Sequence, residues 1–87
     1  MSLGREGEGA DKMQDLIEYM ARALVDEPNQ VRVERIVRGS LTVYKLRVAP
    51  DDVGRVVGRG GRVAAAMRTL LRVAAIRAGE RAVLEIE

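Results

Sequence analysis

Three glycines and two arginines fill positions 58 to 62, in the order Gly58-Arg59-Gly60-Gly61-Arg62. Glycine weakens helices and strands, so this cluster indicates a backbone that turns sharply or that a ligand approaches closely. The residues that follow have helical periodicity, so the turn leads into the first amides of a helix, which lack acceptors within that helix. Such amides attract anions, and the two guanidiniums add positive charge. The stretch therefore predicts a clamp for phosphate groups.

Two well-known nucleotide-binding loops do not fit this stretch. A P-loop requires Gly-Lys followed by Ser or Thr, and no lysine or hydroxyl stands in that place. A dinucleotide-binding fold requires a third glycine where Val63 stands, and a strand where a helical pattern precedes Gly58. The motif alone leaves the kind of phosphate open.

Catalysis is not predicted, because the side chains that usually carry it are missing. The chain has no histidine and no cysteine, and Ser40 lies in a predicted turn with no evident base. Asp51 and Asp52 are better explained as residues at a helix N-terminus than as catalytic acids. No loop collects enough oxygen ligands for a metal ion. We therefore expect no catalytic residue, no metal site and no cofactor.

The positive charge is concentrated around the glycine turn. The formal net charge is only +2, but residues 47–79 hold seven arginines against two aspartates. This excess predicts an anionic partner, although a solvated arginine-rich surface has the same composition. The chain has no cysteine, signal peptide or apolar run long enough to span a membrane, so we expect a cytoplasmic protein without membrane contact.

The elements before the turn are predicted from the spacing of apolar residues. Residues 11–27 have the period of an amphipathic helix that Asp11 caps and Pro28 ends. The stripe expected to face the core is Met13, Leu16, Ile17, Met20 and Leu24. Residues 1–10 are small, polar and without periodicity, which predicts a flexible leader and leaves 11–87 as one domain.

Two strands, residues 31–37 and 41–48, are predicted to form a hairpin around Arg38-Gly39-Ser40. Alternate residues of the second strand share one face, and these are Thr42, Tyr44, Leu46 and Val48. In the first strand the alternation breaks near Ile36–Val37, which favours a bulge or a register shift.

A short helix is predicted after Ala49-Pro50, and a longer one from Arg62 to Ala78 that stops at Gly79. The apolar arc of the longer helix is Val63, Met67, Leu70, Leu71 and Ala74. Arg68 and Arg72 lie outside this arc, where they face either a ligand or solvent. Residues 81–87 alternate as a third strand. The result is an α+β fold with three helices on one face of a three-stranded sheet.

This order of elements and the turn together resemble the KH domains, specifically the bacterial type II arrangement. Residues 56–63, VVGRGGRV, match the KH pattern V-I-G-x-x-G with a basic residue inside the loop. Further similarity through residues 13–26, 46–54 and 61–69 extends the resemblance to the KhpA-type (YlqC-like) single-KH proteins, over about residues 12–87. Ala64 departs from the wider KH pattern, in which a larger aliphatic residue is common, but it is usual in this subgroup.

The resemblance implies a non-catalytic protein that binds single-stranded RNA, in post-transcriptional regulation or RNA chaperoning. By position, Gly58, Arg59, Gly60 and Gly61 would hold the sugar-phosphate backbone, with Arg62 facing a phosphate at the helix N-terminus. Val57 and Val63 would floor a groove for bases that the hairpin borders. It also implies a homodimer, or a heterodimer with a KhpB/Jag-like KH protein. A protein-interaction module with little RNA binding of its own is the alternative.

Overall fold

The structure, a computed structural model, describes the backbone of residues 8–87 and the side chains of residues 12–87. Its main elements are α1 (Glu8–Leu24), β1 (Arg32–Arg38), β2 (Leu41–Arg47), α2 (Val53–Val57), α3 (Arg62–Arg77) and β3 (Arg81–Ile86). Three short 3-10 helices lie between them, at Pro28–Gln30, Pro50–Asp52 and Arg59–Gly61. The predicted order of elements and the α+β class are confirmed.

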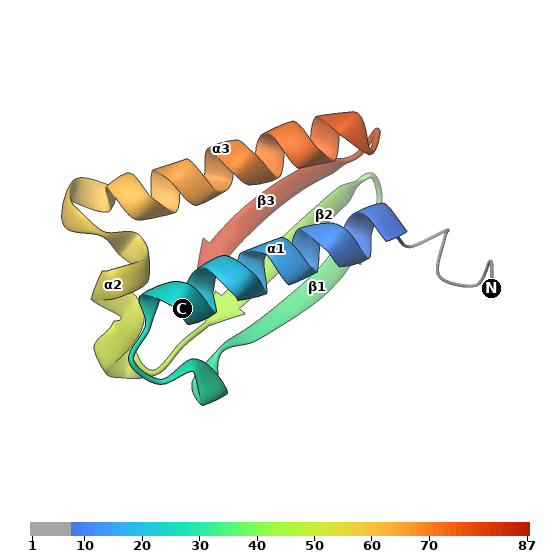
Figure 1. Cartoon of the computed structure of the whole chain (residues 1–87). Helices are drawn as coiled ribbons and strands as arrows, with labels where there is room; N and C mark the ends of the chain where they lie inside the picture. Colours follow the sequence, from blue (N-terminus) through green and yellow to red (C-terminus); the bar gives the residue numbers. More distant parts are fainter. Residues whose placement is uncertain (1–7) are drawn as a thin grey trace.

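The three strands form one mixed sheet in the order β1-β2-β3. Strand β2 is central, antiparallel to β1 and parallel to β3, so β1 and β3 each have one edge that pairs with no strand in residues 8–87. Helices α1 and α3 lie side by side over one face of the sheet, and α2 lies at one end (Figure 1). The predicted arrangement of helices on one face is therefore confirmed.

The hairpin is regular throughout. Its pairs run without interruption from Arg32↔Arg47 to Arg38↔Leu41, so the prediction of a bulge or register shift near Ile36–Val37 is wrong. The sequence alternation breaks there because this part of β1 carries apolar residues on both faces. The connection is a two-residue turn, Gly39-Ser40, in which Gly39 has a φ of 61°, a conformation that glycine adopts without strain.

Helix α1 is shifted toward the N-terminus relative to the prediction. It begins at Glu8, so Asp11 lies inside the helix and is not its cap, and it ends at Leu24, three residues before Glu27. The last helical bond beyond α1 runs from the Val25 amide to the Ala21 carbonyl, at 3.1 Å. The flexible leader predicted for residues 1–10 falls mainly on residues 1–7, which lie outside the described residues.

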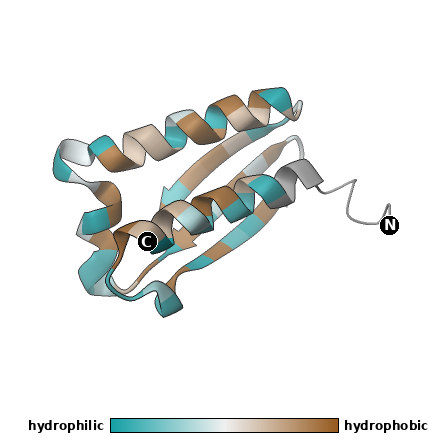
Figure 2. Ribbon diagram, in the orientation of Figure 1, coloured by the Kyte–Doolittle hydropathy of each residue, from teal (hydrophilic) through white to brown (hydrophobic). Residues whose placement is uncertain are grey.

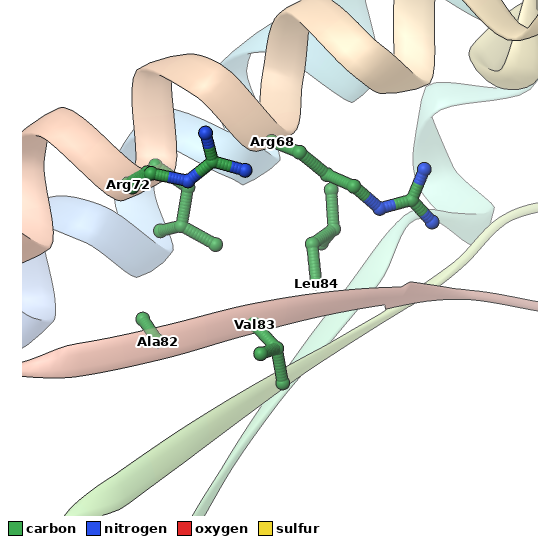
Figure 3. Close-up of a pocket in the computed structure, with 6 residues that line it drawn as sticks. Arg68, Arg72, Ala82, Val83 and Leu84 are labelled. Carbon is green, nitrogen blue, oxygen red and sulfur yellow. The ribbon is translucent and has the colours of Figure 1, made fainter.

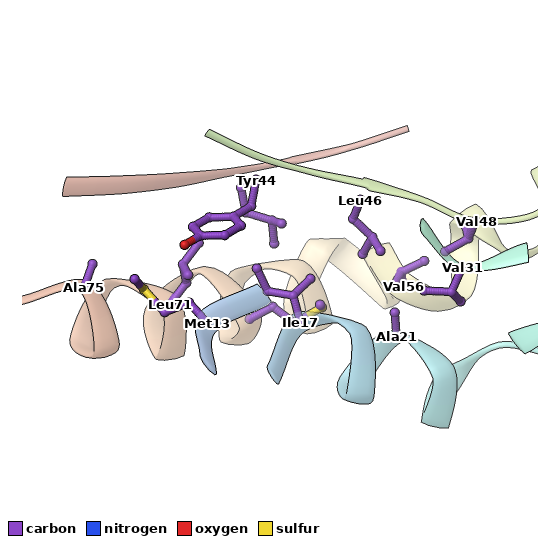
Figure 4. Close-up of a cluster of buried hydrophobic side chains, with 12 residues drawn as sticks. Met13, Ile17, Ala21, Val31, Tyr44, Leu46, Val48, Val56, Leu71 and Ala75 are labelled. Atoms are coloured by element: carbon purple, nitrogen blue, oxygen red, sulfur yellow. The ribbon is translucent and has the colours of Figure 1, made fainter. Parts of the chain in front are cut away.

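The core lies between the sheet and the helices. Tyr44 and Leu46 point from β2 toward Ile17 of α1 and Leu71 of α3 (Figure 4), and all four are at most 1% exposed. Each such burial contributes about 1.5–3 kcal/mol relative to an exposed side chain. Along α1 and α3, hydrophobic and hydrophilic residues alternate as expected for helices with one buried side (Figure 2).

The face of β2 shared by Thr42, Tyr44, Leu46 and Val48 is the inward one, since all four are at most 9% exposed. Of the core residues predicted on the two long helices, Met13, Ile17, Met67 and Leu71 are buried. Four others, Leu16, Met20, Val63 and Ala74, are only partly buried. Two are exposed, Leu24 to 37% and Leu70 to 49%. Small residues fill the closest approaches instead, since Ala21, Ala64 and Ala75 are each at most 3% exposed. Across residues 8–87, every helix is too short or too polar to cross a membrane.

Candidate functional site

The glycine turn joins α2 to α3 through a backbone that only glycine adopts easily. Gly58, Gly60 and Gly61 have φ angles of 78°, 65° and 77°. Positive φ costs other residues about 1–2 kcal/mol at each position. Arg59 therefore stands between positions that demand glycine, and the short 3-10 helix Arg59–Gly61 presents it at the tip of the turn.

The glycines of the turn serve two different purposes. A Cβ at Gly58 would lie 2.4 Å from Cγ2 of Val63 and 2.9 Å from its backbone nitrogen, so Gly58 is required by packing inside the turn. A Cβ at Gly60 or Gly61 would meet no atom within 4 Å. The outer surface of the turn at these two residues is consequently bare backbone that a ligand can approach closely.

The amides of the turn divide into paired and unpaired groups. Gly58 donates to the Gly54 carbonyl at 2.9 Å, Gly61 donates to Gly58 at 3.0 Å, and Arg62 donates to Arg59. The expectation that the Arg62 amide is free is therefore wrong, because the 3-10 turn supplies an acceptor three residues back. The Arg59 and Gly60 amides have no acceptor within the described chain. An anion would thus meet free amides at the tip of the turn, before α3 begins.

Five of the seven arginines in residues 47–79 have no acidic partner among the described side chains, namely Arg59, Arg62, Arg68, Arg72 and Arg77. The other two are paired. Arg47 lies 3.4 Å from Glu87, and Arg55 lies 2.8 Å from Asp26 and 3.3 Å from Asp52. Within this segment, the charge that is free to attract an anion is therefore confined to the glycine turn and α3.

Helix α3 and the edge strand β3 enclose a hollow of about 160 Å³. Its lining consists of Arg68, Leu71, Arg72, Ala82, Val83 and Leu84. Figure 3 shows the Arg68 and Arg72 side chains leaving α3 on the side of β3, above an apolar floor. The sequence left open whether these arginines face a ligand or solvent, and the structure places both in the wall of this hollow. The sequence predicted a groove bordered by the hairpin, whereas this hollow is bordered by β3.

The two valines predicted to floor a groove, Val57 and Val63, do not line this hollow. Val57 is half-buried at the end of α2. Val63 lines a second hollow, of about 290 Å³, between α1 and α3. Its position nine residues before Arg72, at about 100° per residue, puts Val63 on the opposite side of α3 from the arginine-lined hollow.

The hollow between α1 and α3 is entirely apolar. Its lining comprises Tyr19, Met20, Ala23, Leu24, Val63, Ala66, Met67 and Leu70. Tyr19 is 74% exposed at its rim. Sequence reasoning missed this surface because the helical period assigns five of its residues to the core, namely Met20, Leu24, Val63, Met67 and Leu70. Which of these apolar residues become buried depends on the angle at which the two helices cross, and that angle cannot be read from the spacing along one helix.

Asp52 lies at the N-terminus of α2, as predicted, but it has a role that the sequence did not indicate. It is 2% exposed, and its side chain makes no capping hydrogen bond to α2. Its carboxylate instead accepts hydrogen bonds from the Asp26 and Glu27 amides, at 3.2 and 3.1 Å. The predicted place of Asp52 at a helix N-terminus is confirmed, but its hydrogen bonds go to the segment after α1 and not to α2. Asp51, its neighbour, is exposed.

Known proteins match nearly the whole of this fold. The family model for the KH domain of KhpA/KhpB matches residues 14–86. A protein of Treponema pallidum named RNA-binding protein KhpA is 48% identical over 73 residues, which span 84% of this chain and 91% of that protein. Its namesake in Clostridium perfringens is 39% identical over 74 residues, or 85% and 99% of the two chains. The protein of the same name in Mycobacterium tuberculosis is 46% identical over 57 residues, which span 66% of this chain and 71% of that protein.

Proposed function

The chain belongs to the KhpA/KhpB family of KH domains, and on that premise we propose that it binds short segments of single-stranded RNA without catalysing a reaction. The observation that carries the proposal is the bare tip of the glycine turn. There, the unpaired amides of Arg59 and Gly60 lie beside guanidiniums that have no acidic partner among the described residues. Relatives at 39–48% identity are named RNA-binding proteins.

The turn would hold the RNA by its sugar-phosphate backbone. A phosphate oxygen would accept from the Arg59 and Gly60 amides, while the Gly60 and Gly61 backbones allow the strand to approach without a Cβ in the way. Arg59 and Arg62 would neutralise the phosphates on either side. KH loops clamp about four nucleotides in this manner.

The bases would then lie in the hollow between α3 and β3. Its apolar floor suits base faces, and the unpaired edge of β3 offers backbone donors and acceptors to base edges. Arg68 and Arg72 would line the path that leads along α3 from the turn. Val57 would contribute from the end of α2, whereas Val63 would support the turn from within through its contact with Gly58.

A protein partner is the second candidate function, and the apolar hollow between α1 and α3 favours it. Surface of this kind, with Tyr19 and Leu70 exposed, is typical of a protein interface. A second copy, or a KhpB/Jag-like KH protein, would cover it. Two linked domains would also strengthen RNA binding through effective concentration. In this proposal the protein acts in the cytoplasm, in post-transcriptional regulation or RNA chaperoning.

The proposal is tested by removing the turn's charge and bare backbone together. Fluorescence anisotropy with a labelled single-stranded RNA is expected to give a dissociation constant on the order of micromolar for the natural chain, since one small domain makes few contacts. The double variant Arg59→Asp, Gly60→Asp should bind at least about tenfold more weakly, because it loses a phosphate contact and adds repulsion.

The hairpin turn supplies a matched control. Arg38→Asp with Gly39→Asp makes the same change of charge at the hairpin. The φ of Gly39 is 61°, close to the 65° of Gly60, and a Cβ at either glycine would meet no atom within 4 Å. We expect this control to retain most of the affinity. Equal losses in the two double variants would remove the glycine turn from the mechanism.

A further inference from the structure

Helix α2 cannot determine its own position. It has only five residues, Val53–Val57, far fewer than an isolated helix needs for stability. The glycine turn begins at the next residue, so the place and direction of the turn depend on whatever holds α2. The apolar anchor is Val56, which is fully buried in the core.

The polar anchor is Asp52, which immediately precedes α2. Its side chain is one of the least exposed in the described part of the chain, although a buried carboxylate is costly unless it is hydrogen-bonded. Both of its oxygens are used: Oδ1 accepts from the Asp26 amide and Oδ2 accepts from the Glu27 amide. These amides belong to the segment that follows α1. Asp52 therefore ties the end of α1 to the start of α2.

Arg55 closes the connection from the other side. Its Nε lies 3.3 Å from Oδ1 of Asp52, and an Nη lies 2.8 Å from Oδ2 of Asp26. The planar guanidinium can hold two carboxylates in a fixed relative orientation, which a lysine ammonium cannot. Asp52, Arg55 and Asp26 together form a closed network around the junction of α1 and α2, which we call the junction network.

Hydrogen bonds lead from the junction network into the turn. The Gly58 amide donates to the carbonyl of Gly54, the residue beside Arg55, at 2.9 Å. The Gly61 amide in turn donates to the Gly58 carbonyl at 3.0 Å. A shift of α2 would therefore displace the acceptors that shape the turn, together with the Arg59 and Gly60 amides that lie between them.

We propose that the junction network is a positioning device for the glycine turn, in which Asp52 and Asp26 strengthen RNA binding although they carry the charge that RNA repels. The inference rests on the proposed function. Arg55 acts here through the two carboxylates and does not contact the RNA. A turn that is already in its bound shape loses less conformational entropy on binding, and this is how the network raises affinity.

Three isosteric variants test the proposal, because positioning and simple electrostatics predict opposite signs. Asp26→Asn, Asp52→Asn and Asp51→Asn each raise the net charge by one. Charge alone predicts slightly tighter RNA binding for all three. Positioning predicts binding weaker by about threefold or more for Asp26→Asn and Asp52→Asn, since each breaks the network. Asp51 is exposed and pairs with no other described residue, so Asp51→Asn should bind as tightly as the natural chain or tighter.

Amide hydrogen exchange measured by NMR gives a readout that needs no RNA. We expect the Gly58 and Gly61 amides to exchange faster in Asp52→Asn than in Asp51→Asn, while amides of the central strand β2 keep their protection. Binding is compared at a temperature where circular dichroism finds every variant folded. If Asp52→Asn does not fold, Asp26→Asn carries the test, because its side chain is 70% exposed.

The outcomes separate this inference from the proposed function. If the natural chain does not bind RNA, the proposed function fails, and the exchange measurement still decides whether the network positions the turn. If the natural chain binds RNA, equal or tighter binding by Asp26→Asn and Asp52→Asn overturns the inference and leaves the function standing. Tighter binding by Asp26→Asn alone would identify Arg55, freed from one partner, as a direct RNA contact and would likewise overturn the inference.

Discussion

Gly58 and Val63 lie so close together that a Cβ added at Gly58 would approach Cγ2 of Val63 to 2.4 Å. The same Cβ would lie 2.8 Å from Cβ of Val63 and 2.9 Å from its backbone nitrogen. The first glycine of the turn is therefore part of the folded interior, while Gly60 faces open space. One motif thus contains one glycine needed for folding and others that leave room for a ligand.

Substitution by alanine should separate these two roles. Gly58→Ala combines a positive φ with overpacking and is expected to lower the free energy of unfolding by about 3 kcal/mol or more. Gly60→Ala has only the backbone cost, about 1–2 kcal/mol. Urea denaturation followed by circular dichroism measures both. Because the backbone nitrogen of Val63 remains in place, adding Val63→Ala should restore only part of the Gly58→Ala loss, and full recovery would contradict the packing argument.

The salt dependence of RNA binding should identify which arginines meet phosphates. Each phosphate contact on a single strand contributes about 0.7 to the slope of log affinity against log salt. Arg59→Gln and Arg62→Gln are each expected to reduce that slope by about 0.7. Arg47→Gln serves as the control, because Arg47 lies at the end of β2 and is paired with Glu87. An unchanged slope in Arg59→Gln would show that its guanidinium stays in solvent.

The order of elements and the place of the turn could be predicted from the sequence because both depend on local signals. Apolar spacing, Pro50 and Gly79 set the element boundaries, and three glycines within four residues are typical of a tight turn. Contacts between distant residues could not be predicted in this way. Just beyond the end of α1, the Asp26 and Glu27 amides donate to the Asp52 carboxylate, which lies 26 and 25 residues later in the chain.

The candidate site was predictable in its residue types but not in its three-dimensional arrangement. The sequence counts Arg55 among the positive charges near the turn, yet two carboxylates pair with it. It also gives Leu70 the period of a core residue, although that side chain is half exposed. The pairing of charges and the crossing of helices depend on how the whole chain packs. Neither can be predicted from the spacing of residues along one helix.

The arginines of α3 allow a test of the hollow beside β3. Arg68→Gln and Arg72→Gln should each weaken RNA binding by about threefold to tenfold, because both side chains line that hollow. Arg77→Gln is the matched control. Arg77 belongs to the same helix, but it lines a different hollow that also includes Lys12 and Met13 of α1. Anisotropy titrations at one salt concentration compare the three variants, and equal effects would favour a diffuse attraction over a defined path.

The apolar hollow between α1 and α3 predicts a change of oligomeric state. Leu70→Asp places a charge at its rim, where desolvation in an interface is costly, and should convert a dimer to a monomer in sedimentation-velocity experiments. The monomer is expected to stay folded, since Leu70 is 49% exposed. Val37→Asp is the control, because Val37 is 55% exposed on β1 and lies outside the hollow.

The RNA affinity of the Leu70→Asp monomer should fall only by the avidity that a second domain provides, because the glycine turn is unchanged. If the dimer persists in Leu70→Asp but dissociates in Val37→Asp, the interface lies on the sheet and this prediction is wrong.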